Sequence, residues 1–168
     1  MLQADPLWFL VGPLLLWMTA ETVLPTLAPE LSRRAYWSGA GAIFLAFALS
    51  LMVRALLQAV VGRRLGLRPK VVALHPGGST FDVSAGVSVK AAVLMAGAGT
   101  LASIGIGALF AGLFLSGVAA GVPLILIAAA FCMAGLNWLV AVAALIPAYP
   151  LEGGQVLRLW LRRRGASK

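Results

Sequence analysis

Four long apolar stretches dominate this sequence of 168 residues and constrain its fold more than any other feature. They cover about residues 7–28, 36–62, 91–120 and 124–146. A helix needs roughly 20 predominantly apolar residues to cross the hydrocarbon core of a bilayer. Only 11% of the residues are charged, whereas soluble proteins carry about 25%. The sequence therefore predicts an all-α integral membrane protein with about four transmembrane helices, forming one membrane domain over residues 1–168.

The first apolar stretch has the position of a signal peptide but not its composition. Its N-terminal flank contains Asp5 and no basic residue, and the apolar run continues to about Leu27. We therefore expect a retained first helix. Pro13, Glu21 and Pro25 interrupt it, which a membrane helix tolerates when its neighbours satisfy the freed backbone groups.

The connection between the second and third stretches predicts a small β-hairpin. The glycine- and arginine-containing segment over residues 62–70 closes the second helix. From about residue 71 to residue 89 the sequence alternates loosely around His75-Pro76-Gly77-Gly78. Glycine and proline at the centre of such a run, with β-branched residues on both sides, are typical of a hairpin turn.

The third stretch is rich in glycine and repeats small residues at a spacing of four positions. Ser103 with Gly107 and Ala108 with Gly112 are examples. Because small residues let the backbones of membrane helices approach closely, we expect both pairs to lie in helix contacts.

A short segment over residues 155–164 follows the last apolar stretch and is predicted to be helical. It is much too short to cross a bilayer. We expect this helix to lie at the membrane interface.

The formal net charge of +8 carries information on topology. The basic residues gather near predicted helix ends and do not form an arm interleaved with aromatic residues, so they do not indicate nucleic-acid binding. Arg33 and Arg34 fall on one side of the membrane. The positive-inside rule then predicts a multi-pass protein in the lipid bilayer with the hairpin and both termini in the cytoplasm, since the other side carries Arg63, Arg64, Arg68, Lys70, Lys90, Arg158, Arg162, Arg163, Arg164 and Lys168.

Few residues in the chain could bind a metal. The one cysteine, Cys132, lies in a predicted span, which excludes an internal disulfide and favours an apolar packing role. His75, the only histidine, is most simply a polar residue at the membrane surface, and Asp82 a solvated hairpin residue. Glu152 is the plausible carboxylate companion of His75, but two ligands do not make a catalytic zinc site.

The end of the last stretch carries a specific motif. Residues 137–154 read N-W-L-V-A-V-A-A-L-I-P-A-Y-P-L-E-G-G. This segment resembles the site-2 protease family, whose pattern is N-x-x-P-x-x-P-L-D-G-G with another asparagine seven residues earlier. Asn137 matches that earlier asparagine, whereas Ala144 stands at the asparagine of the motif and Glu152 at its metal-binding aspartate.

Three further segments follow the order of the same family. Its second helix carries H-E-x-x-H, followed by A-R-R-L-G, a Gly-Gly hairpin and an A-G-P helix start. Here G-R-R-L-G over residues 62–66, Gly77-Gly78 and A-G-A over residues 96–98 occupy the last three places. The resemblance implies the fold of an intramembrane zinc metalloprotease, with Gly77, Gly78, Asn137 and Ala144 in its substrate groove.

The zinc-binding motif itself is missing. In H-E-x-x-H, two histidines on one helix face bind zinc and the glutamate activates the metal-bound water. Counting back from residues 62–66 places Arg54, Ala55 and Gln58 at these positions. Arginine cannot ligate a metal, glutamine is a poor ligand and alanine offers no base. We therefore predict no catalytic residue, no metal and no cofactor, although the family resemblance implies zinc.

Arg54 needs an anion, because an unpaired charge inside a membrane helix costs several kcal/mol. If the family fold holds, Arg54 and Glu152 converge, with Gln58 one turn along on the same face. Our hypothesis is that an Arg54–Glu152 ion pair stands where zinc would be bound. The alternative is that Arg54 extends to the interface and Glu152 faces water.

Three functions remain open from the sequence. The first is a non-catalytic relative of the family that uses the substrate groove to bind or regulate a transmembrane partner. The second is an intramembrane zinc endopeptidase, against which the missing ligands argue. The third is a structural subunit of a membrane complex, with the third helix as a packing surface.

Overall fold

The computed structural model is a bundle built around four helices that are long and apolar enough to cross a membrane. It describes residues 2–4, 6, 8–29, 31–67, 72–75, 78–81, 88–147 and 151–165. Within these residues the four spans are Phe9–Leu27, Arg33–Arg64, Val89–Ala120 and Leu124–Leu145. The prediction of a multi-pass membrane protein with about four spans is confirmed.

The first span is the least regular one. It consists of α1 (Trp8–Met18), a π-helical turn η1 (Thr19–Val23) and α2 (Leu24–Leu27). Glu21 lies in η1, where its Oε1 accepts hydrogen bonds from Arg33 Nη2 (2.8 Å) and Trp37 Nε1 (2.9 Å). The start of the next helix thus satisfies the one charge of the first span.

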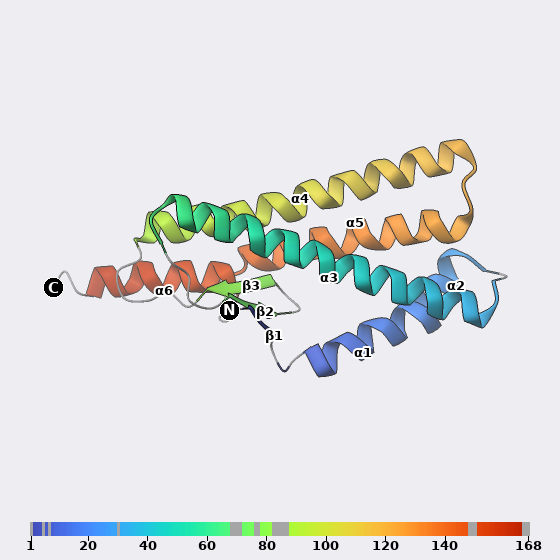
Figure 1. Cartoon of the computed structure of the whole chain (residues 1–168), viewed down its shortest axis with the longest axis horizontal. Coiled ribbons are helices and arrows are strands. Elements are labelled where there is room, and N and C mark those ends of the chain that lie inside the picture. Colours follow the sequence, from blue (N-terminus) through green and yellow to red (C-terminus); the bar gives the residue numbers. More distant parts are fainter. Residues whose placement is uncertain are drawn as a thin grey trace.

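The other three spans are the single helices α3 (Arg33–Arg64), α4 (Val89–Ala120) and α5 (Leu124–Leu145) (Figure 1). Helix α3 begins before residue 36, the expected start, because the Ser32 side chain caps it by accepting a hydrogen bond from the Ala35 backbone N–H. Helix α5 ends at Leu145, two residues before Pro147, which disfavours helical backbone in the residue that precedes it.

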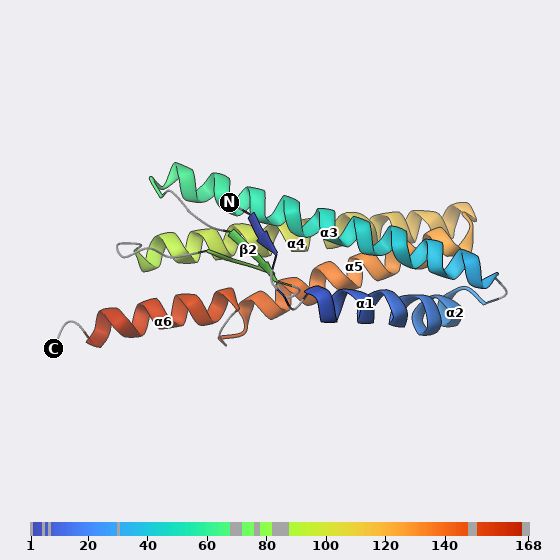
Figure 2. The same ribbon diagram turned by 60° about the horizontal axis from the view of Figure 1, so that its bottom comes forward.

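The last helix, α6 (Glu152–Gly165), differs from the expectation in start and direction. It begins at Glu152 rather than at residue 155, since the backbone N–H of Gln155 bonds to the carbonyl of Leu151 and closes the first turn there. A helix in the membrane interface would cross the axis of the bundle. Figures 1 and 2 instead show α6 running along that axis, beyond the end of α5.

Three short strands lie near α6. They are β1 (Leu2–Ala4), β2 (Val72–His75) and β3 (Gly78–Phe81), with β1 parallel and β3 antiparallel to β2. The expected hairpin over about residues 71–89 also includes residues 71, 76–77 and 82–87, which lie outside the described residues. The hairpin as a whole therefore stays a prediction. The strands contact α3, α5 and α6 at one end of the bundle, named here the α6 end.

Small residues on one side of α4 set how closely its neighbours pack. Buried positions recur every four residues, and glycine stands where a neighbour is large. A Cβ atom at Gly107 would overlap the ring of Trp138 in α5, with Cε2 only 3.2 Å away. The expected contact of Ser103 and Gly107 is confirmed, as both are buried. Ala108 and Gly112 are both exposed, so no described helix of this chain packs on them and the contact expected there stays a prediction.

Replacement of Gly107 by alanine should destabilise the protein by about 1–3 kcal/mol, since the added methyl group overpacks the contact with Trp138. Gly112→Ala is the matched control, because nothing lies within 4 Å of a Cβ atom there. It should be neutral, or stabilising by up to about 1 kcal/mol through helix propensity. Reversible unfolding in detergent measures both, and equal effects of the two variants would contradict the packing argument.

Candidate functional site at the Arg54–Glu152 ion pair

Arg54 is completely buried, with 0% of its surface exposed, and it is the largest fully buried side chain among the described residues. The alternative that Arg54 extends to the interface is therefore excluded. Taking a guanidinium out of water costs several kcal/mol unless anions and hydrogen-bond acceptors surround it. A functional site is therefore expected among the neighbours of Arg54.

Glu152 supplies the anion. Arg54 Nη2 lies 2.7 Å from Glu152 Oε1, and both side chains are buried. The predicted ion pair between α3 and the first residue of α6 is confirmed. The Nη2–Oε1 contact lacks ideal hydrogen-bond direction, so charge attraction dominates it.

Helix α4 supplies the remaining acceptors. Arg54 Nη1 donates to the backbone carbonyl of Gly99 (2.9 Å) and to Ser103 Oγ (2.7 Å). The guanidinium therefore joins three helices, α3, α4 and α6. The acceptors were not identified from the sequence: Ser103 was noted only as a small packing residue, and a backbone carbonyl leaves no signal in the sequence.

Gln58 completes the cluster one turn further along α3. Its Nε2 donates to Glu152 Oε1 at 2.9 Å, so one carboxylate oxygen receives both α3 side chains. Gly99 leaves space on α4 for the Gln58 side chain. A Cβ atom there would overlap the Gln58 amide, with the amide carbon Cδ at 2.6 Å.

Gly153 positions Glu152 by letting α6 start directly against the end of α5. A Cβ atom on Gly153 would lie 2.7 Å from the carbonyl oxygen of Ile146 and 2.9 Å from that of Leu145. Any side chain would push the two helices apart. The carboxylate of Glu152 also lies at the N-terminus of α6, where the helix dipole favours negative charge.

The other residues singled out from the sequence are dispersed. Ala55 and Ala144 are buried, and Asn137 is buried with its Nδ2 donating to the Met133 carbonyl of its own helix (2.9 Å). His75 ends β2 and Gly78 begins β3, where the structure describes only the strand pairing. The remaining two, Gly77 and Asp82, lie outside the described residues, and the groove roles stay predictions.

The donor set does not fit zinc. Zinc in proteins is held by cysteine, histidine and carboxylate side chains, and a catalytic site needs three of them. Within the described residues no three such side chains converge. At the position implied for the metal, the one carboxylate already receives Arg54 and Gln58.

Removal of one partner of the buried pair should lower the free energy of unfolding far more than removal of both partners. We expect Arg54→Met or Glu152→Gln to cost about 3–5 kcal/mol of stability, because each leaves a buried group uncompensated. The double variant should be markedly more stable than the sum of the two single effects predicts. A double-mutant cycle of unfolding free energies measures the coupling.

The Arg33–Glu21 pair provides the exposed control, with side-chain exposures of 79% and 30%. Its double-mutant cycle should give about 1 kcal/mol or less. Coupling energies of the same size in the two cycles would contradict the role assigned to burial.

Comparison with known proteins finds similarity to a mycobacterial protein. The chain is 34% identical over 155 residues to the protein named "Putative zinc metalloprotease Rip3" in two strains of Mycobacterium tuberculosis. The alignment covers 89% of this chain and 39% of the length of that relative. No protein-family model and no solved structure matches. The similarity to a protein named as a zinc metalloprotease agrees with the resemblance to the site-2 protease family.

Proposed function

We propose that this chain is a non-catalytic, site-2-protease-like membrane protein that binds or regulates a membrane partner. The observation that carries the proposal is the buried Arg54–Glu152 ion pair, formed by the residues that match a zinc ligand position and the metal-binding aspartate of the family motif. The matched relative spans far more than this chain, so activity of the whole relative does not transfer to it.

The chemistry of the replaced residues supports the loss of hydrolysis. A guanidinium stays charged at any physiological pH, so Arg54 can neutralise Glu152 as a metal cation would, but cannot activate water. Ala55 stands at the position of the general base and has no group that accepts a proton. Metal binding, water activation and proton transfer are therefore all lost together.

Binding of a partner does not require the metal. In the family resemblance, an edge strand of the hairpin accepts an extended substrate, and strand addition needs only free backbone groups. Gly77, Gly78, Asn137 and Ala144 are the residues that the resemblance assigns to this groove. We place the groove and both chain termini on the cytoplasmic side, following the distribution of basic residues.

A structural subunit is the second candidate, and one feature of α4 favours it. Ala108 and Gly112 are exposed one turn apart, and nothing covers the Cβ position of Gly112. Small residues on a membrane-facing surface allow a partner helix to approach closely. A stable complex that survives purification without a processed substrate would favour this candidate.

Metal content tests the loss of the zinc site. The purified protein should contain no stoichiometric zinc by elemental analysis in detergent. A triple variant, Arg54→His, Ala55→Glu and Gln58→His, should gain about one zinc per chain, because two histidines one helical turn apart then face Glu152. Adding Glu152→Gln to the triple variant should remove the gain by deleting the third ligand.

The same samples separate the proposal from a protease. Stoichiometric zinc in the natural protein, together with cleavage of a transmembrane test substrate that stops on chelation, would overturn the proposal. Failure of the triple variant to bind zinc, despite a native melting transition, would show that Arg54, Gln58 and Glu152 do not occupy a former metal site.

A further inference from the structure

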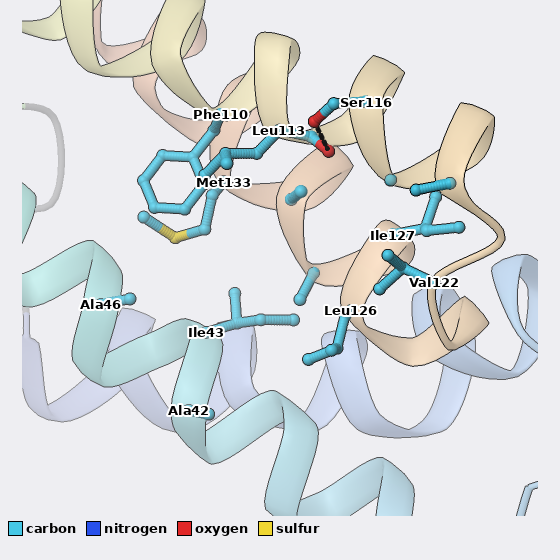
Figure 3. A pocket seen from close by; sticks show the side chains of 14 residues that line it. Ala42, Ile43, Ala46, Phe110, Leu113, Ser116, Val122, Leu126, Ile127 and Met133 are labelled. Atoms are coloured by element: carbon cyan, nitrogen blue, oxygen red, sulfur yellow. Dashed lines mark hydrogen bonds between the residues drawn. The ribbon is translucent and has the colours of Figure 1, made fainter.

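An apolar cavity of about 510 Å³ lies at the end of the bundle opposite to the α6 end, between α3, α4 and α5 (Figure 3). It is distinct from the Arg54 cluster and shares no residue with it. Residues from all three helices line it, among them Ala42, Ala46, Phe110, Ser116, Leu126 and Met133.

The cavity follows from how the helices diverge. At the α6 end, Arg54 bonds α3 to α4 through Gly99 and Ser103. At the other end, a tight turn at Gly121 (φ 66°) connects α4 to α5. There α4 stays beside α5 and separates from α3 (Figure 1). A wedge-shaped gap therefore separates α3 from α4, and α5 forms its third side.

The lining selects an entirely apolar ligand. Ser116 is the only polar side chain among the residues that line the cavity, and its Oγ donates to the Leu113 carbonyl at 3.2 Å. None of the described residues that line the cavity is charged. An extended peptide is disfavoured because its backbone N–H and C=O groups would find no partners there.

The dimensions match half of a bilayer. Phe110 and Ala120 mark the two ends of the α4 wall, and at 1.5 Å per residue they are about 15 Å apart, half of the roughly 30 Å hydrocarbon core. The cavity begins beside the turn between α4 and α5, where α4 ends. It therefore has the depth of one lipid leaflet.

The volume distinguishes between apolar occupants. A cavity of about 150 Å³ can bind benzene, with its six carbons. By that measure 510 Å³ holds roughly 20 carbons, the size of one lipid tail. A helix about 10 Å wide and about 15 Å long would occupy more than twice this volume.

We propose that this cavity, named here the tail groove, binds one acyl chain of a membrane lipid from the leaflet at the α4–α5 turn. The proposal is independent of whether the Arg54 site is catalytic. The lipid tail fills the wedge that the polar contacts at the α6 end leave open, so it supports the separated ends of α3 and α4.

Photolabelling tests the proposal. The full chain is reconstituted in phosphatidylcholine vesicles that contain a phosphatidylcholine with a diazirine in its acyl chain, and labelled residues are mapped by mass spectrometry. We expect labelling of the half-buried groove residues Phe110 and Ile127 to exceed several-fold that of lipid-facing Leu101 and Leu139, which are 68% and 65% exposed.

Two matched variants sharpen the result. Ala46→Phe places a ring in the tail groove and should reduce the labelling of Phe110 and Ile127 several-fold, with Leu101 unchanged. Ala119→Phe adds the same ring on an exposed part of α4 that does not line the groove, and should leave the labelling as it is. Leu101 labelling serves as an internal measure of correct insertion.

Two results would overturn the proposal. Labelling in proportion to surface exposure, unchanged in Ala46→Phe, would show that no lipid chain is held in the groove. Protection of the groove residues from the lipid label, together with a dimer in sedimentation of the purified protein, would show that a second copy of the chain occupies the groove.

Discussion

A permanently charged side chain in an apolar helix is the constraint on which this structure depends. Arg54 cannot lose its charge and reaches no water, so the fold has to bring an anion and two acceptors to it. Glu152 comes from the last helix, and Ser103 and the Gly99 carbonyl come from the third span. Apolar packing between membrane helices is weakly directional. The ion pair and its hydrogen bonds therefore select which helices meet at this end.

Glycine makes this arrangement possible at two points. Gly99 lets the Gln58 amide pass over α4, and Gly153 lets α6 begin against the last carbonyls of α5. Each glycine stands next to a polar group of the cluster rather than in the apolar core. The first glycine of the G-G pair in the sequence motif thus has a physical reason in this chain, because Gly153 has no space for a side chain.

The sequence was sufficient for the spans and for the ion pair, and insufficient for the geometry around them. Apolar length predicts a membrane helix directly, and the resemblance to the site-2 protease family implied that Arg54 and Glu152 lie together. The Gly99 carbonyl could not be foreseen, since any residue has one. The start and direction of α6 depend on packing against α4 and α5, and the tail groove depends on the divergence of α3 and α4. Residue patterns do not encode such angles.

The order of synthesis gives the buried cluster a further meaning. Glu152 follows Gln58 by 94 residues, so at roughly 5–20 residues per second the ribosome makes the carboxylate about 5–20 seconds after the helix that needs it. During that interval α3 has to enter the bilayer with its arginine uncompensated, at a cost of about 2.5–3.5 kcal/mol on insertion scales. The strongly apolar residues that flank Arg54 favour insertion of α3 and offset this cost. Synthesis of α6 is therefore the step that completes the buried cluster.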